Sequence, residues 1–165
     1  MTNPYDALPA VPSFTLASRE LKPGEPISRG DVSPHLTWSG APPDTKSFAL
    51  TMFDADAPTP SGFWHWAVMG IPPSVSTLER GAGAANGTLL PRGAVQLPND
   101  ARVASFIGVA PPAGHGPHRY FIVVHALDVE TLPIPNEGTP AYLSFLMLKH
   151  TLARATLVVT AETKS

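Results

Sequence analysis

Residues 119–127 read RYFIVVHAL, and this stretch is the longest strand candidate in the chain. It is rich in β-branched and aromatic residues and follows a turn of glycine and proline, as strands in antiparallel sheets often do. Two further runs have the same character, SFALTMF at 47–53 and WHWAVMGI at 64–71, and each ends at a turn that contains proline. Shorter candidates are FTLA at 14–17 and TLVVT at 156–160. Together these runs predict a mainly β protein.

Proline and glycine support this fold class and limit the helices. The chain of 165 residues holds 20 prolines and 13 glycines, about one residue in five where ordinary usage gives roughly one in eight. The prolines are spread along the chain, and residues 141–165 form the longest stretch without one. There the apolar spacing predicts one helix that begins at Pro140 or Ala141, runs through Leu146 and His150 towards Ala153, and is capped by Thr139.

Length and composition predict one folded domain over residues 1–165. The chain is 43% hydrophobic and 15% charged, which argues against disorder, and its length is enough to bury a core. Residues 1–13 contain three prolines, and we expect them to form an extended arm across that domain. Residues 74–98 are rich in glycine and small side chains and are expected to form a long irregular connection.

Charge and cysteine content exclude several classes of function. Eleven basic and 13 acidic residues give a net charge of −2, and no lysine or arginine cluster is present, so nucleic acid is not an expected partner. The chain has no cysteine, which excludes disulfides and thiolate metal sites. Its first residues do not resemble a secretory signal, and no apolar run reaches the length of a membrane span. We therefore expect a cytoplasmic protein without a transmembrane segment.

The first segment with chemical potential is Asp54-Ala55-Asp56-Ala57-Pro58, directly after a predicted strand. If the alternation of that strand continues, Asp54 and Asp56 share a face with Met52, and two carboxylates converge on one site. The alternative is structural, because aspartate often caps a turn through nearby backbone N–H groups. The segment by itself leaves both interpretations open.

The second segment is Gly62-Phe63-Trp64-His65-Trp66. Strict alternation predicts that His65 shares a face with Ala67 and Met69, while the two tryptophans face the core on the other side. Among apolar neighbours the pKa of His65 would be lowered and the neutral ring favoured. The alternative is a core histidine that is hydrogen-bonded to a backbone carbonyl.

The third segment, residues 111–120, is a rigid turn that leads into the longest strand. His118 and Tyr120 are two positions apart and therefore share a face, where both can donate hydrogen bonds to an anion. Arg119 points the opposite way and is expected to pair with a carboxylate. His115 and His118 have the spacing of a metal pair, but no third ligand is suitably spaced. We predict no metal and no cofactor.

These three segments, in this order, resemble those of the phosphatidylethanolamine-binding protein family, in particular its bacterial, Raf-kinase-inhibitor-like branch. Residues 54–58 resemble the family's D-P-D-A-P, residues 62–66 the bacterial G-x-W-H-W, and residues 116–120 the sequence G-x-H-R-Y. Residues 33–40 also resemble a bacterial motif. Two departures stand out: Ala55 replaces a proline, and Val109 and Ala110 lie where relatives carry glycine and proline.

The resemblance implies a Greek-key fold of antiparallel sheets with few helices and a small pocket that binds a phosphate-like or carboxylate anion or a related head group. Bacterial relatives are commonly homodimers, so a homodimer is expected. Carried over by position, the ligand-binding residues would be Asp54, Asp56, Pro58, Trp64, His65, Gly108, Pro112, His118 and Tyr120.

Three functions are compatible with such a pocket. The first is a small-ligand-binding protein. The second is an enzyme in which Asp54, His65 and His118 perform acid–base catalysis on a small organic metabolite, because enzymes commonly place carboxylates and histidines together for this purpose. The third is a regulator that binds another protein, such as a kinase.

Overall fold

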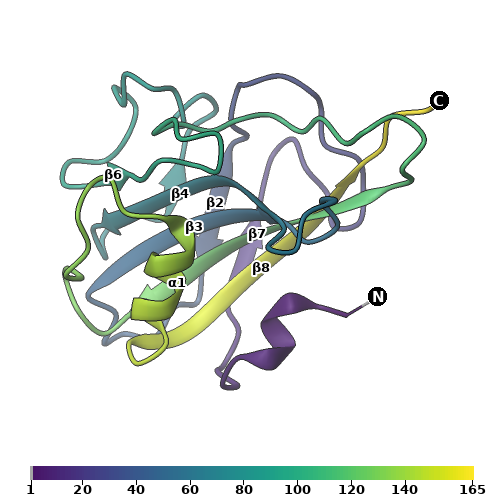
Figure 1. The fold of residues 1–165 in the computed structure, drawn as a ribbon. Coiled ribbons are helices and arrows are strands. Elements are labelled where there is room, and N and C mark those ends of the chain that lie inside the picture. Colours follow the sequence, from purple (N-terminus) through teal and green to yellow (C-terminus); the bar gives the residue numbers. More distant parts are fainter. Residues whose placement is uncertain (1) are drawn as a thin grey trace.

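Two antiparallel β-sheets form the body of the molecule in this computed structural model, which describes residues 2–165. The larger sheet has the order β6-β4-β3-β7-β8 (Figure 1). Its strands are β3 (Ser47–Asp54), β4 (Phe63–Ile71), β6 (Val95–Gln96), β7 (His118–Leu127) and β8 (Thr151–Ala161). The smaller sheet has the order β1-β2-β5, with β1 (Thr15–Ala17), β2 (Leu36–Ser39) and β5 (Thr77–Leu78). The predicted mainly β fold with antiparallel sheets and one α-helix is confirmed.

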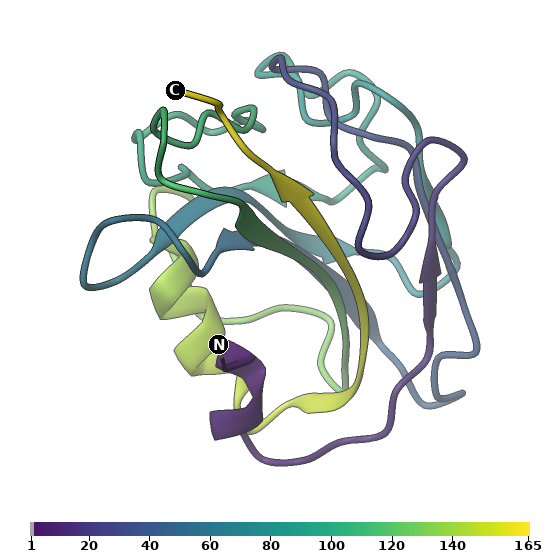
Figure 2. The same ribbon diagram turned by 90° about the vertical axis from the view of Figure 1, so that its right-hand side faces the viewer.

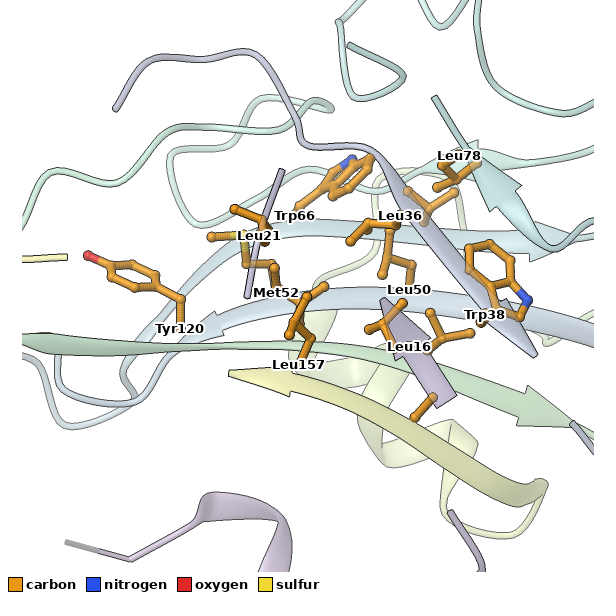
Figure 3. Packing of buried hydrophobic residues seen from close by; sticks show 14 of the residues in the cluster. Leu16, Leu21, Leu36, Trp38, Leu50, Met52, Trp66, Leu78, Tyr120 and Leu157 are labelled. Carbon is orange, nitrogen blue, oxygen red and sulfur yellow. The ribbon is translucent and has the colours of Figure 1, made fainter. Parts of the chain in front are cut away.

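The main hydrophobic core lies between the two sheets. It takes alternate residues from the strands of the larger sheet, such as Leu50, Trp66 and Ile122, and packs them against Leu36 and Trp38 of β2 (Figure 3). Burying alternate side chains in this way fixes the register of each strand, because a slip of one residue would turn the whole apolar set outward. The core therefore also fixes which side chains reach the ends of the strands.

The opposite face of the larger sheet is covered by helix α1 (Pro140–Met147), as the turned view shows (Figure 2). Leu143 and Met147 pack there with Ala49 and Ala67. The helix begins as predicted, with Thr139 accepting a hydrogen bond from the backbone N–H of Tyr142 at 3.0 Å.

The predicted end of the helix was wrong. The apolar spacing suggested continuation to Ala153, but the helix ends at Met147 and β8 already begins at Thr151. From there the chain pairs with β7 along nearly its whole length, so that Leu127 faces Thr151 and His118 faces Ala161. Tertiary pairing therefore outweighs the helical pattern of these residues.

The N-terminal arm differs in part from the extended conformation that was expected. Residues Pro4–Ala7 form a short 3-10 helix, η1, whose first turn is capped by the side chain of Asn3. Tyr5 projects from it onto the rings of Phe121 and His125, at centroid distances of 6.0 and 6.3 Å. The arm thus covers part of the sheet face that α1 leaves open (Figure 2).

Three short strands were not predicted. Strand β2 holds only four residues, and β5 and β6 hold two each within the connection of residues 74–98. Runs this short carry no periodic signal of their own. They are strands because the neighbouring chain pairs with them.

Candidate functional site

A cavity of about 230 Å³ opens at the end of the larger sheet, where β3 ends and β4 and β7 begin. Seven of the nine predicted ligand-binding residues line it: Asp54, Pro58, His65, Gly108, Pro112, His118 and Tyr120. The remaining two predicted residues, Asp56 and Trp64, do not line it. The sequence therefore located the cavity but not its complete lining.

Asp54 and His118 form a buried pair in this cavity. Nδ1–H of His118 donates to Oδ2 of Asp54 at 2.7 Å, and the two side chains are only 1% and 5% exposed. The other oxygen of Asp54 accepts from the backbone N–H of Asp56 at 2.9 Å. Asp54 therefore caps the turn after β3, as the structural interpretation expected, and its side chain also lines the pocket.

A second histidine connects this pair to the surface. Nε2 of His118 lies 2.6 Å from Nδ1 of His115, so one proton is shared between the two rings. His115 is exposed. In the sequence, His115 and His118 have the spacing of a metal pair. In the structure the two rings are hydrogen-bonded to each other. Both ring nitrogens of His118 are engaged, which leaves it no free donor for a ligand.

A β-bulge at the start of β4 sets the direction of His65. Met52 pairs with Trp66 and Phe53 pairs with Trp64, so His65 is the extra residue between them. A bulge of this kind interrupts the alternation of side chains along its strand. The ring of His65 therefore lies 5.3 Å from that of Tyr120, between centroids.

Two predictions for this segment were wrong for the same reason. His65 does not share a face with Ala67 and Met69, which lie with the cluster under α1. Trp64 does not join Trp66 in the core, and its ring instead packs at a tilt against Phe53 outside the pocket, with 4.4 Å between centroids. The aromatic ring of the pocket wall is that of the neighbouring residue, Phe63.

The tautomer of His65 is fixed by the backbone. Its Nδ1 lies 2.9 Å from the carbonyl oxygen of Ile107, and since a carbonyl can only accept, this nitrogen carries the proton. Burial lowers the pKa of His65, and the Ile107 carbonyl and the Asp54 carboxylate oppose that shift only in part. The ring is therefore neutral near pH 7, and its Nε2 is a hydrogen-bond acceptor. The hydrogen bond to a backbone carbonyl, which was the structural alternative for His65, is therefore present.

Tyr120 brings an unused polar group to the cavity. Its side chain is fully buried, and among residues 2–165 its hydroxyl has no hydrogen-bond partner. The hydroxyl points away from the other labelled core side chains (Figure 3). Burial, and then the nearby Asp54 carboxylate, raise the pKa of Tyr120. The group remains protonated and is a donor. Buried polar groups without partners are uncommon and often mark a place where a ligand or water binds.

Asp56 has a structural role outside the pocket. Strand β3 ends at Asp54, two residues before Asp56, so the alternation that was to bring both carboxylates together does not extend to Asp56. Asp56 instead binds Arg119 through both carboxylate oxygens, at 2.9 Å to Nε and 2.9 Å to Nη2. The expected pairing of Arg119 with a carboxylate is thus found, and the expectation that Asp56 lines the pocket was wrong.

Gly108 shapes the wall through its backbone. Its N–H donates to Oδ1 of Asp31 at 2.8 Å, and a Cβ at this position would lie 2.3 Å from the carbonyl oxygen of Gly30. Only glycine permits that approach. Sequence reasoning missed the carbonyl of Ile107, because a main-chain contact does not depend on residue type. It also missed Asp31, whose side chain binds a backbone N–H 77 positions away.

Among residues 2–165 no group of three or more histidine, aspartate or glutamate side chains is arranged to hold a metal ion. Within the same range no helix is long and apolar enough to cross a membrane.

Fold and cavity together define a mainly β protein of two antiparallel sheets with a small histidine-containing pocket at one end of the larger sheet. Residues 17–162 match the family model described as phosphatidylethanolamine-binding protein. The chain belongs to this family.

Bacterial proteins are among its relatives. UPF0098 protein YbcL of Escherichia coli K12 is 41% identical over 163 residues, which is 92% of this chain and 89% of the relative. UPF0098 protein YbhB of the same organism is 39% identical over 127 residues, 77% of this chain and 79% of the relative. These names state no activity, and the relation is one of sequence.

Solved structures agree with the fold. The crystal structure of E. coli YbcL, described as a new member of the mammalian PEBP family, superposes with a TM-score of 0.89, at 41% identity, over 92% of this chain and 99% of that one. The family homologue CT736 of Chlamydia trachomatis gives a TM-score of 0.77 at 30% identity, over 92% and 98%. Both cover nearly the full length of the two chains.

Proposed function

We propose that this protein binds a small ligand whose phosphate-like or carboxylate head group enters the cavity beside the Asp54–His118 pair. The observation that carries the proposal is the hydroxyl of Tyr120, which is buried, protonated and without a partner among residues 2–165. An oxygen of the ligand would accept its hydrogen bond. His65 lies against the same ring and offers a second contact.

The size and walls of the cavity support a small ligand. Its volume of about 230 Å³ lies below the range of roughly 300 to 1,000 Å³ that is usual for drug-sized ligands. Apart from the polar groups described above, its walls are largely apolar, with Phe63, Ile107 and three prolines. A short molecule with one polar end and a compact apolar body fits this arrangement.

Titration calorimetry with inorganic phosphate, phosphoethanolamine and acetate tests the proposal on the wild type and on Tyr120→Phe. Because the hydroxyl of Tyr120 has no hydrogen-bond partner among residues 2–165, we expect its removal to leave the fold intact and affinity to fall about tenfold, the value of one hydrogen bond to a charged group. Tyr142→Phe, on the exposed face of α1, is the matched control and retains full affinity. Unchanged affinity in Tyr120→Phe would refute the proposal.

One observation favours a second candidate, an enzyme that acts on a small organic metabolite. Asp54, His118 and the exposed His115 form a continuous chain of hydrogen bonds from the pocket to solvent, an arrangement that can carry a proton during acid–base catalysis. The test incubates a metabolite extract with the wild type and with Asp54→Asn. A compound consumed by the first and not by the second supports catalysis, and identical profiles reject it.

Assembly and location stay proposals that follow from the family. We propose a cytoplasmic homodimer, and light scattering coupled to size-exclusion chromatography measures the oligomeric state directly. A monomer at micromolar concentration would refute the dimer. We propose no role in kinase regulation, because no feature of the described structure favours one.

A further inference from the structure

Among residues 2–165, two side-chain atoms of the cavity have no hydrogen-bond partner at all, and the spare capacity of the others is for accepting only. Both oxygens of Asp54 and both ring nitrogens of His118 are engaged within the protein. The hydroxyl of Thr59 donates to the carbonyl oxygen of Gly62 at 2.6 Å. The two unpartnered atoms are a donor, the hydroxyl of Tyr120, and an acceptor, Nε2 of the neutral His65 ring.

This combination does not suit a fully deprotonated anion. A carboxylate or phosphate dianion only accepts hydrogen bonds, so it can use the hydroxyl of Tyr120 but meets a lone pair at Nε2 of His65. The mismatch disappears if one proton enters with the ligand. The proton then lies between a ligand oxygen and Nε2, and each polar atom has a partner.

The charges around Tyr120 and His65 also disfavour a dianion. Among residues 2–165 no lysine or arginine lines the cavity. The negative charges of Asp54 and Asp100 oppose the lowering of the pKa of His65. Those of Asp54 and Asp56 help to raise the pKa of Tyr120, and the positive charge of Arg29 opposes them. Asp56 is itself paired with Arg119, and Asp54 with His118. A site with this surplus of carboxylates disfavours a dianion and favours a ligand that arrives with its charge neutralised.

We infer that the cavity selects small monocarboxylic acids with a short apolar chain, and that each is bound together with one proton that bridges its carboxyl group and Nε2 of His65. The carbonyl oxygen of the acid accepts from Tyr120, and its chain lies against Phe63 and Ile107. No covalent bond forms or breaks, and the proton comes from solvent. This inference rests on the proposed binding function and specifies its ligand class.

Proton uptake has a measurable consequence. When a ligand binds with one proton that neither partner holds when free, its apparent affinity falls about tenfold for each unit of pH. Inorganic phosphate, which is largely dianionic at pH 8 and has no apolar chain, should bind more weakly than butyrate by about tenfold or more. Phosphate binding would rise less steeply towards low pH than butyrate binding, because its own second proton is still present at pH 6.

The experiment is calorimetric titration of the full chain with butyrate and with phosphate at pH 6, 7 and 8. Each titration is run in two buffers of different ionisation enthalpy, which gives the number of protons taken up. For butyrate at pH 8 we expect about one proton per ligand. His65→Phe should bind weakly and without proton uptake, whereas Tyr120→Phe should lose about tenfold in affinity and keep the uptake. In the wild type, the ¹⁵N chemical shift of Nε2 of His65 should move towards that of a protonated nitrogen when butyrate binds.

The outcomes separate the inference from the proposed function. Tight butyrate binding with one proton supports both. A second outcome is that a probe binds and Tyr120→Phe weakens its binding, but no proton is taken up or phosphate binds more tightly than butyrate. This outcome overturns the inference and leaves the proposed function standing. If neither probe binds at millimolar concentration at any of the three pH values, the proposed function fails and the inference fails with it.

Discussion

Nδ1 of His118 lies 2.7 Å from Oδ2 of Asp54, although 64 positions separate the two residues in the chain. The register between β3 and β7 brings them together, since Asp54 pairs with Tyr120 at the point where the two strands meet the cavity. Both side chains are buried, so water cannot replace this hydrogen bond if either partner is removed. The pair joins the last residue of one central strand to the first residue of its neighbour.

Replacing Asp54 should therefore destabilise the protein strongly. Asp54→Ala leaves a buried imidazole without its acceptor and also removes the cap on the turn at Asp56, and we expect a loss of about 3 to 5 kcal/mol in the free energy of unfolding. The matched control is Asp128→Ala, which breaks a pair with His150 of nearly equal length, 2.8 Å, in which the side chains are 44% and 34% exposed. That variant should lose no more than about 1 kcal/mol. Urea denaturation measures both, and equal losses would contradict the argument.

The bulge in β4 predicts different effects for two adjacent aromatic residues. Phe63→Ala removes part of the pocket wall, so ligand affinity should fall several-fold. Trp64→Ala removes a ring that packs against Phe53 outside the pocket, so it should cost about 2 to 4 kcal/mol of stability and leave affinity within about twofold. Calorimetry with the best acid probe, together with urea denaturation, separates the two. If Trp64→Ala abolishes binding in a folded protein, the placement of this segment is wrong.

How far the sequence predicted this site depends on the kind of contact. The three long central strands follow from dense β-branched and aromatic residues, and their ends place Asp54, His118 and Tyr120 correctly. Strict alternation along β4 did not predict the direction of the His65 side chain. That direction depends on a bulge, which arises from the pairing of β4 with β3. The helix was predicted too long because β7 offers residues from Thr151 onward a better partner. The carbonyl of Ile107 and the N–H of Gly108, which bind His65 and Asp31, are backbone atoms and leave no pattern in residue type.

Gly108 should tolerate no side chain. In Gly108→Ala the new Cβ would meet the carbonyl oxygen of Gly30 at 2.3 Å, and backbone must move to relieve the contact. We expect a loss of about 1 to 3 kcal/mol and weaker ligand binding, because the same segment carries the carbonyl that orients His65. Asp31→Ala is the companion variant, since it removes the hydrogen bond to Gly108 without adding bulk. Equal stability and affinity in Gly108→Ala and the wild type would contradict this account of the wall.

Stability should fall in mild acid because of a histidine outside the pocket. His125 is buried under the arm, where its Nε2 lies 3.0 Å from the hydroxyl of Thr51. Burial, and then the charge of Arg154, lower the pKa of His125 to about 3. In the unfolded chain a histidine titrates near 6.5. Between these two values the unfolded state binds the additional proton.

The sign and size of the effect follow from that difference. Above pH 7 neither state is protonated at His125, and its contribution does not change with pH. As pH falls from about 6.5 towards 3, the free energy of unfolding should drop by up to about 1.4 kcal/mol per unit from this residue. His65, whose pKa is also lowered by burial, adds to the decline over the first part of this range.

Urea denaturation at half-unit steps from pH 8 to pH 4 tests the contribution of His125. His125→Gln keeps a side chain able to hydrogen-bond Thr51 but cannot titrate, so at pH 8 it should be less stable than the wild type by about 1 kcal/mol. Its stability should decline less steeply in acid, and the two curves should cross between pH 6 and pH 5. If His125 takes up the proton, its replacement by glutamine must change the slope of stability against pH. Parallel curves for the two proteins would therefore show that His125 is not the group responsible.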